Sequence, residues 1–409
     1  MTFIRWAWAL MLALGATALR CDAQPTSELV VSSDPELGLL AAELLPDLAA
    51  RAGMQLRAPV RLEERSRDEL VAYLESKIDE ELPEEEARDR RSAYALLGLM
   101  PPDLDLRQVL LDLYTEQVAG FYEPDSTALF VLDDQSEESL EALLLHELVH
   151  AVQDQTVDLD DLTDPDRGND RASAAQAAIE GQATLVMLEY MTEQMTGVPV
   201  DLGQVPDFSA QIRPALEAMN AQFPALARAP RVVRESLLFP YVEGAGFVQR
   251  LWAGGERLDP FGATLPLSTE QVLRPRAAPP VGVRLDVSNG RVVLEDVLGR
   301  LELGVLVEDV LGLDGSGGVV GAGGPAEGWD GDRYALVETP EGDRSLVFVV
   351  VWDTDAARDR FVEAVRAARH RFGGPVTVDG RIEGERAVSV LRVGEGVVDA
   401  SISLSESVP

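Results

Sequence analysis

The chain has 409 residues, enough for two domains that each bury a core of their own. Its formal net charge of −36 at pH 7 repels the phosphates of nucleic acids and the headgroups of anionic membranes, which argues against both as partners. Cys21 is the one cysteine in the sequence, so the chain cannot form an internal disulfide.

Residues 1–24 have the composition of a signal peptide. A basic residue precedes an apolar run from Trp6 to Leu19, which is too short for a membrane-spanning helix and is followed by small and polar residues. The segment therefore predicts an exported protein. Cys21 lies where a lipidated bacterial cysteine would, although Arg20 is an unfavourable residue directly before it. A lipoprotein that is anchored to a membrane only through Cys21 is therefore an alternative to a freely exported protein.

The first elements expected after this segment are mostly helices. A helix is expected at 36–53, broken near Pro46, followed by a strand at 54–62. Further helices are expected at about 66–80, 84–98 and 104–118. Segment 119–134 predicts a β-hairpin with its turn at 123–126. It could form the edge along which an extended peptide substrate pairs, or be an ordinary packed hairpin.

Two of the three histidines of the chain lie in the stretch LLLHELVHAVQDQ, residues 143–155. His146, Glu147 and His150 follow the order H-E-x-x-H, in a helix that Ser136 is expected to cap. Four helical residues turn about 400°, so both imidazoles project from one side and can share a metal ion. Glu147 lies about 100° round the helix, where it can reach a metal-bound water. An accidental match in an ordinary helix is the alternative.

An aspartate-rich loop is expected at 158–170, after the histidine-bearing helix. The EF-hand order of ligands and glycine is absent from it, so we interpret it as a solvated loop rather than a calcium site.

A second long helix is expected at about 172–195. Glu180 lies on a face that is otherwise nearly apolar, and a buried carboxylate is costly unless it is paired or coordinated. Gly181 would let another backbone approach closely. Glu189 and Glu193 share a face with Gln182 and are expected to be solvated.

Glu180 is the best candidate for a third metal ligand. Gln153 and Thr156 stand where the glycine and third histidine of H-E-x-x-H-x-x-G-x-x-H would be, which excludes that form. His370 is remote and is expected at the surface. Two histidines and one glutamate leave a fourth position for water, as a catalytic zinc requires.

The sequence resembles the gluzincin type of zinc metallopeptidase, and within it a loose group of exported bacterial proteins. The resemblance rests on HELVHAVQDQ at 146–155, IEGQAT at 179–184 and GFYEPDSTALFVLD at 120–133, and more weakly on PLSTEQVLRP at 266–275 and GWDGDRYALV at 328–337. It implies a zincin-like fold. His150 and Glu180 are 30 positions apart, further than in the best-known gluzincins, and the aspartate-rich loop would absorb the extra length.

Residues 205–256 are expected to be helical, with breaks at four prolines, Pro206, Pro214, Pro224 and Pro240. Tyr241 has two interpretations. Its hydroxyl could stabilise the negative charge that develops in a metallopeptidase reaction, or the residue could be a buried core tyrosine.

The remaining chain predicts a small α+β unit that follows a boundary near 274–280. Helices are expected at about 293–312 and 354–371, and a glycine-rich loop at 315–328. Strands are expected at about 281–286, 333–338, 345–352, 382–392 and 396–404. This unit shows no catalytic pattern.

The sequence therefore predicts an α+β protein with a mainly helical, zincin-like metallopeptidase domain at 25–275 and a smaller α+β domain at 280–409. We expect an exported enzyme in which His146, His150 and Glu180 bind Zn²⁺ and Glu147 is the general base for hydrolysis of a peptide or protein substrate. The alternative is a non-catalytic exported binding or scaffold protein that retains the fold. The oligomeric state is not predicted.

Overall fold

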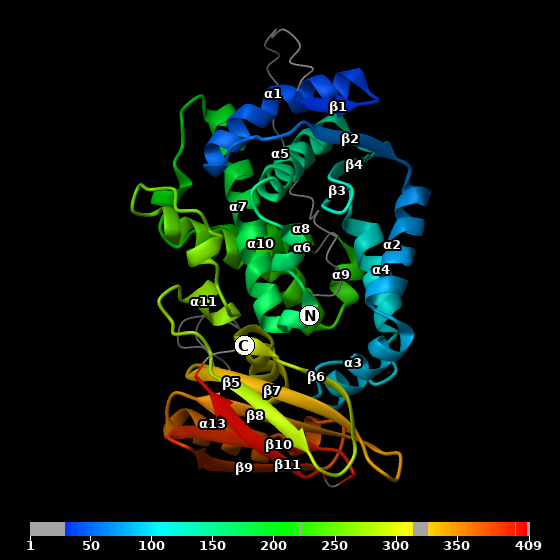
Figure 1. Cartoon of the computed structure of the whole chain (residues 1–409), viewed down its shortest axis with the longest axis vertical. Helices are drawn as coiled ribbons and strands as arrows, with labels where there is room; N and C mark the ends of the chain where they lie inside the picture. Colours follow the sequence, from blue (N-terminus) through cyan, green and yellow to red (C-terminus); the bar gives the residue numbers. More distant parts are fainter. Residues whose placement is uncertain (1–28, 221–222, 314–325, 397, 407–409) are drawn as a thin grey trace.

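The computed structural model describes residues 29–220, 223–313, 326–396 and 398–406. Residues 29–273 form a largely helical region and residues 282–406 an antiparallel-sheet region, named here the helical region and the sheet region (Figure 1). The predicted α+β class is confirmed, while the exact domain division stays a prediction. No helix within the described ranges is long and apolar enough to span a membrane. The predictions for 1–24, including Cys21, and for most of the loop at 315–328 lie outside the described residues.

A four-stranded sheet lies at the end of the helical region that is far from the sheet region (Figure 1). Its order is β1-β2-β4-β3, with β1 (Val30–Ser32), β2 (Val60–Arg65) and β4 (Ala128–Leu132) parallel. The antiparallel β3 (Gly120–Glu123) forms one edge. β3 and β4 are the hairpin predicted at 119–134. The strand predicted at 54–62 instead begins at Val60.

Four helices before the hairpin agree with the predicted positions, namely α1 (Pro35–Ala52), α2 (Arg67–Glu81), α3 (Glu84–Leu96) and α4 (Leu106–Gln117). The predicted break near Pro46 is wrong, because α1 continues through it. Leu44, Leu45 and Leu48 are buried around this proline. Packing of this apolar face holds the helix together where proline removes one backbone hydrogen bond.

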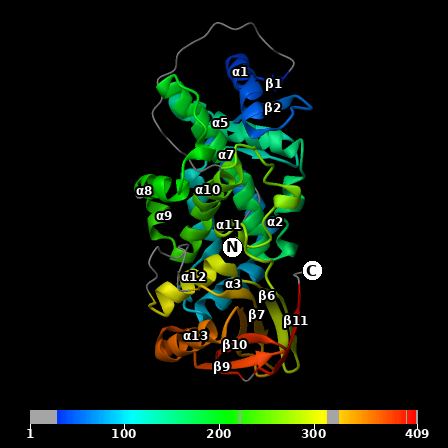
Figure 2. The same cartoon turned by 90° about the vertical axis from the view of Figure 1, so that its left-hand side faces the viewer.

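Three long helices form the middle of the helical region: α5 (Glu137–Asp154), α7 (Asn169–Thr196) and α10 (Arg231–Trp252). The Ser136 hydroxyl accepts a hydrogen bond from Ser139 N, so the predicted cap of α5 is confirmed. α7 and α10 run side by side in both views (Figures 1 and 2). A Cβ atom on Gly181 would lie 2.1 Å from the carbonyl carbon of Gly244, which confirms the predicted close backbone approach.

Shorter helices complete this region, namely α6 (Leu159–Leu162), α8 (Phe208–Asn220), α9 (Pro224–Arg228) and α11 (Thr269–Leu273). The loop expected at 158–170 contains α6 and a 3₁₀ turn, Pro165–Arg167. The breaks expected at Pro214 and Pro240 are wrong, since these residues lie inside α8 and α10.

The sheet region is built on a five-stranded antiparallel sheet of order β6-β7-β8-β10-β9. Helix α13 (Asp355–Ala367) covers one face, and the pair β5–β11 lies against the other (Figure 2). Successive residues of β8 point to opposite faces of the sheet. Phe348 and Val350 pack in the core that includes α13, whereas Val349 packs in the core under β5. The strands are β5 (Gly282–Val287), β6 (Arg291–Asp296), β7 (Trp329–Glu338), β8 (Arg344–Trp352), β9 (Val376–Glu383), β10 (Arg386–Val393) and β11 (Ala400–Ser405).

Two predictions for the sheet region are corrected. The helix expected at 293–312 is strand β6 followed by α12 (Gly299–Val305) and a π-helical turn, Leu306–Val310. The single strand expected at 382–392 is the second strand of a β9–β10 hairpin. In both places pairing with a neighbouring strand decides the local structure, and short apolar runs do not carry that information.

Candidate functional site

Helix α5 places His146 and His150 on one face, as their spacing predicts. Their ring centroids are 4.8 Å apart and the ring planes cross at 81°. Both side chains are buried, with exposed fractions of 5% and 0%. Buried imidazoles need polar partners, and here these are Glu180 on α7 and, for His150, also Gln153 on α5.

Glu180, on α7, is the carboxylate that contacts both imidazoles. Its Oε2 atom lies 2.9 Å from His146 Nε2 and 3.5 Å from His150 Nε2. Glu180 is completely buried. The 30 positions that separate His150 from Glu180 therefore close in space, because α5 and α7 pack against each other.

The spacing of these three donor atoms suits one metal ion. Ligand atoms at about 2.0–2.2 Å from a tetrahedral zinc are about 3.4 Å from one another. The two distances from Glu180 Oε2 to the imidazole nitrogens, 2.9 Å and 3.5 Å, lie on either side of that value. The donor types, imidazole nitrogen and carboxylate oxygen, are also those that bind zinc.

Glu147 belongs to the same buried cluster. The donor atoms of His146, Glu147 and His150 all lie within 4.8 Å of one another, so this trio could also hold a metal ion. Glu147 Oε2 accepts a hydrogen bond of 2.9 Å from Tyr122 N on the edge strand β3. Its Oε1 atom is buried and has no hydrogen-bond partner within the described part of the chain. One of its oxygens is thus held by the backbone of β3, while the other has no hydrogen-bond partner among the described residues.

Tyr241, on α10, brings a hydroxyl into the cluster. The hydroxyl donates to Glu180 Oε1 at 3.2 Å, and the ring centroid lies 5.9 Å from that of His146. The residue is also buried, with an exposed fraction of 4%. The two interpretations of Tyr241 are therefore compatible, since it is a core tyrosine whose polar end lies in the site.

Burial and mutual charge set the protonation of the cluster. Burial raises the pKa of Glu147 to about 8 and lowers the pKa of His146. Burial alone would lower the pKa of His150, but the Glu180 charge and hydrogen bonds to Glu180 and Gln153 outweigh it and raise the pKa to about 9. Burial alone would raise the pKa of Glu180, but the charges of both histidines and the hydrogen bonds to them together outweigh burial and lower this pKa.

The sequence analysis does not predict that two glutamines, Gln153 and Gln182, belong to the site. Gln153 accepts a hydrogen bond from His150 Nδ1 and Gln182 accepts one from Gln153, and both are completely buried. Gln153 lies three residues after His150, on the same helix face, which is the signal that could have revealed it.

The prediction of a solvated face around Gln182 and Glu189 is wrong. Glu189 is buried and pairs with Arg257 at 2.7 Å. Glu193 is partly exposed and pairs with Arg51. The partners that permit this burial lie far away in sequence, so helix periodicity could not show them.

The predicted surface position of His370 is confirmed. It is exposed in a 3₁₀ turn, Arg369–Arg371, of the sheet region. All the histidines that enter the cluster therefore come from α5.

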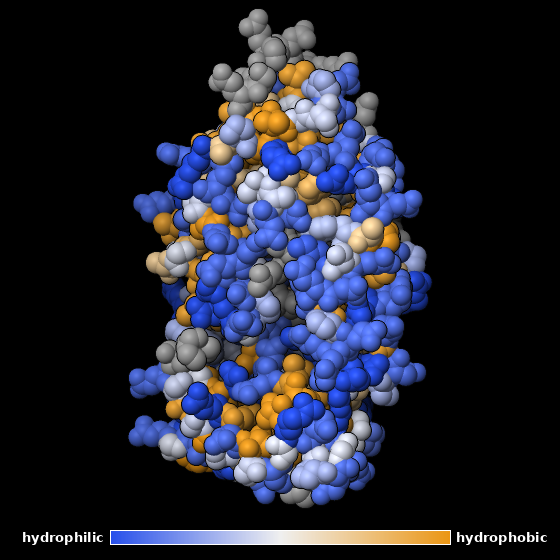
Figure 3. Space-filling view, turned by 45° about the vertical axis from the view of Figure 1, so that its right-hand side comes forward, coloured by the Kyte–Doolittle hydropathy of each residue, from blue (hydrophilic) through white to orange (hydrophobic). Residues whose placement is uncertain are grey.

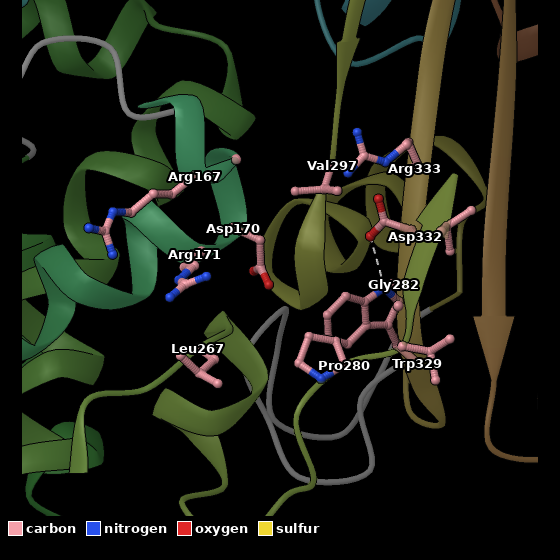
Figure 4. A pocket seen from close by; sticks show the side chains of 14 residues that line it. Arg167, Asp170, Arg171, Leu267, Pro280, Gly282, Val297, Trp329, Asp332 and Arg333 are labelled. Carbon is pink, nitrogen blue, oxygen red and sulfur yellow. Dashed lines mark hydrogen bonds between the residues drawn. The ribbon is translucent and has the colours of Figure 1, made fainter. Parts of the chain in front are cut away.

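A small cavity lies away from the histidines, between α7 and β7 at the junction of the two regions (Figure 4). Asp170, ten residues before Glu180 on α7, lines it opposite Trp329 and Asp332, so the cavity lies about 15 Å from the cluster along the helix. Its volume of about 40 Å³ has room for on the order of three water molecules.

The visible face of the molecule is mostly hydrophilic, with hydrophobic residues in small groups, one of them over the sheet region (Figure 3). This surface agrees with the large net negative charge of the chain.

Comparison with known proteins identifies a domain but no activity. Residues 291–403, just over a quarter of the chain, match the family described as Domain of unknown function (DUF8575). No curated protein and no solved structure matches the chain. The matched segment begins at β6, ends within β11 and contains none of the residues of the histidine cluster.

Proposed function

We propose that the protein is a zinc-dependent metallopeptidase of the gluzincin type. The observation that carries this proposal is the contact of Glu180 Oε2 with both imidazoles, at 2.9 Å and 3.5 Å, beside a second buried carboxylate, Glu147. Two histidines and one glutamate leave a position free for water, whereas structural zinc sites are closed by four protein ligands.

Glu180, rather than Glu147, is the proposed carboxylate ligand. Glu180 contacts the Nε2 atoms of both histidines, whereas one oxygen of Glu147 is held by Tyr122 N on β3. Glu147 is thus displaced toward the edge strand. A carboxylate in that place suits a base that faces a reacting water.

The residues would divide the reaction between them. When bound, zinc polarises the substrate carbonyl and lowers the pKa of a bound water to about 7. Glu147 removes the proton of the attacking water and returns it to the leaving amine. The Tyr241 hydroxyl has one hydrogen, which it donates to Glu180 Oε1; in the reaction it would transfer this hydrogen bond to the oxygen on which negative charge develops.

The edge strand β3 is the proposed place for the substrate backbone. β3 has β4 on one side, and Tyr122 N points away from β4 toward Glu147. An extended peptide that pairs with the backbone groups of this edge that Glu147 does not occupy would bring its carbonyl next to the metal ligands. Peptides or proteins are accordingly the proposed substrates.

Export, and an anchor at Cys21, remain proposals that rest on the composition of residues 1–24. The competing function is a non-catalytic binding or scaffold protein with the same site. A protein that binds zinc but cleaves no member of a diverse peptide library would support that alternative.

Glu147→Gln tests the mechanism. The amide keeps the size of the side chain but cannot accept the proton of water, so we expect unchanged zinc content and a loss of peptide hydrolysis of at least about 10²- to 10⁴-fold. Zinc is measured by elemental analysis, and hydrolysis with a library peptide that the parent protein cleaves. A variant as active as the parent would refute the assigned role of Glu147.

A further inference from the structure

A chain of amide hydrogen bonds extends from His150 into the protein. His150 Nδ1 lies 2.8 Å from Gln153 Oε1, and Gln153 Nε2 lies 2.9 Å from Gln182 Oε1 and 3.0 Å from Ile179 O. Gln182 Nε2 donates in turn to Ala52 O, at the end of α1, at 3.1 Å. His150, Gln153 and Gln182 all have an exposed fraction of 0%, so water does not compete for these bonds.

Two backbone carbonyls fix the direction of every bond in this chain. A carbonyl oxygen can only accept, so the atom that faces Ile179 O must be the NH₂ group of Gln153, and the atom that faces Ala52 O must be that of Gln182. The oxygen of Gln153 therefore faces His150. An amide oxygen can only accept, so His150 Nδ1 carries the proton.

We propose that Gln153 is a positioning residue that keeps the proton of His150 on Nδ1 and thereby directs the Nε2 lone pair at the metal. The inference rests on the proposed metal site. Nε2 is the His150 nitrogen that lies 3.5 Å from Glu180 Oε2, on the side of the other ligands. Metal-binding histidines depend on such an acceptor at the second ring nitrogen to fix tautomer and ring orientation.

The same amides link the two helices that bear ligands. Gln153 is on α5 with His150, while Ile179 and Gln182 lie on α7, immediately before and two residues after Glu180. The bonds from Gln153 therefore fix the position of α5 relative to α7 at the level of the site. A neutral amide does this without a third buried carboxylate beside Glu147 and Glu180, which would add a large desolvation cost.

Gln153→Met tests the role, with Gln155→Met as the matched control. Methionine has nearly the size of glutamine but no amide oxygen. Gln155 directly follows the last residue of α5, and its side-chain oxygen accepts hydrogen bonds from Arg57 N and Ala58 N at the surface. We expect Gln153→Met to weaken zinc binding about 10- to 100-fold, as loss of such acceptors does. Gln155→Met should change it by no more than about twofold. Zinc affinity is measured by competition with a chromophoric chelator.

Nuclear magnetic resonance of ¹⁵N-histidine-labelled, zinc-free parent protein gives a second readout that needs neither metal nor variant. Three histidines give few signals, and the proton on His150 Nδ1 should be present and protected from exchange. A parent that binds no zinc refutes the proposed function, while this signal still tests the inference. A missing or rapidly exchanging Nδ1 proton, or a Gln153→Met affinity within about twofold of the parent, would overturn the role of Gln153.

Discussion

A buried carboxylate of the sheet region, Asp332, and the histidine cluster of the helical region have different partners. In the sheet region Asp332 accepts hydrogen bonds from Leu298 N, Gly299 N and the Trp329 indole, so its oxygens face donors that belong to the fold. In the helical region titratable groups face one another: Glu180 contacts both imidazoles, and Glu147 lies beside them. Satisfied single carboxylates stabilise an architecture, whereas convergent carboxylates and imidazoles form a place for a cation.

The segment that matches a known family and the candidate metal site lie in different regions of the molecule. The sheet region contains the segment that matches a family of unknown function, and its core is a packed sheet between α13 and the β5–β11 pair. The histidine cluster lies outside that segment, on α5 and α7. The activity should therefore respond to changes in the helical region and tolerate equally severe changes in the sheet region.

Removing a histidine from each region gives the largest expected difference. His150→Leu deletes one of three proposed ligands, and since zinc sites are worth about 10–16 kcal/mol in total, we expect zinc affinity to fall at least a hundredfold. His370→Leu, in the sheet region, should leave zinc affinity unchanged because His370 is exposed and outside the cluster. Chelator competition measures both, and equal affinities would contradict the assignment of the site.

One closely packed glycine in each region allows the two regions to be compared. A Cβ at Gly181 would lie 2.1 Å from Gly244, and one at Gly331 would lie 2.3 Å from Val281 O. We expect either alanine variant to lower the free energy of unfolding by about 1–3 kcal/mol or more, measured by urea denaturation. Only Gly181→Ala should also weaken zinc binding, because it separates α7 from α10 beside Glu180. Gly254→Ala, where a Cβ meets nothing within 4 Å, is the neutral control.

The smallest effect concerns pH at the junction of the regions. Burial raises the pKa of Asp332 from 3.8 to about 7 and that of Asp170 to about 6. Between pH 4 and 7 these two carboxyls keep protons in the folded protein that they have released in the unfolded chain, so their contribution to the free energy of unfolding falls as pH rises through this range. Asp332→Asn removes one such group and should reduce that fall by about 1 kcal/mol or more. Urea titrations at pH 5 and 7.5 measure it, and an unchanged slope would refute the assignment.

Helix periodicity was sufficient to predict the core of the site. The i, i+4 spacing of His146 and His150 requires a shared face in any helix, and the apolar neighbours of Glu180 indicate a buried carboxylate that needs a partner. Both arguments use only local geometry. The same geometry could have indicated Gln153, three residues after His150 on α5, but not Gln182, because Gln182 joins the site only through the packing of α5 against α7.

The predictions that the structure contradicts are wrong for one shared reason. Pro46 and Pro240 lie inside helices because tertiary packing compensates for the lost hydrogen bonds. Glu189 is buried because Arg257, 68 positions away, pairs with it. The helix predicted at 293–312 is wrong at strand β6 because the partner of this strand, β7, begins more than 30 residues later in the sequence. Sequence patterns predict the structure that depends on residues close together in the chain, but not the structure that depends on partners far away in the sequence.

Metal analysis of the purified parent protein tests the central claim most directly. After dialysis against a small excess of zinc and removal of free metal, we expect one zinc ion per chain in the parent and less than about a tenth of that in the His146→Leu/His150→Leu double variant. One zinc per chain that depends on both histidines supports the account. A folded parent protein that retains no zinc, or retains it equally in the double variant, would contradict it.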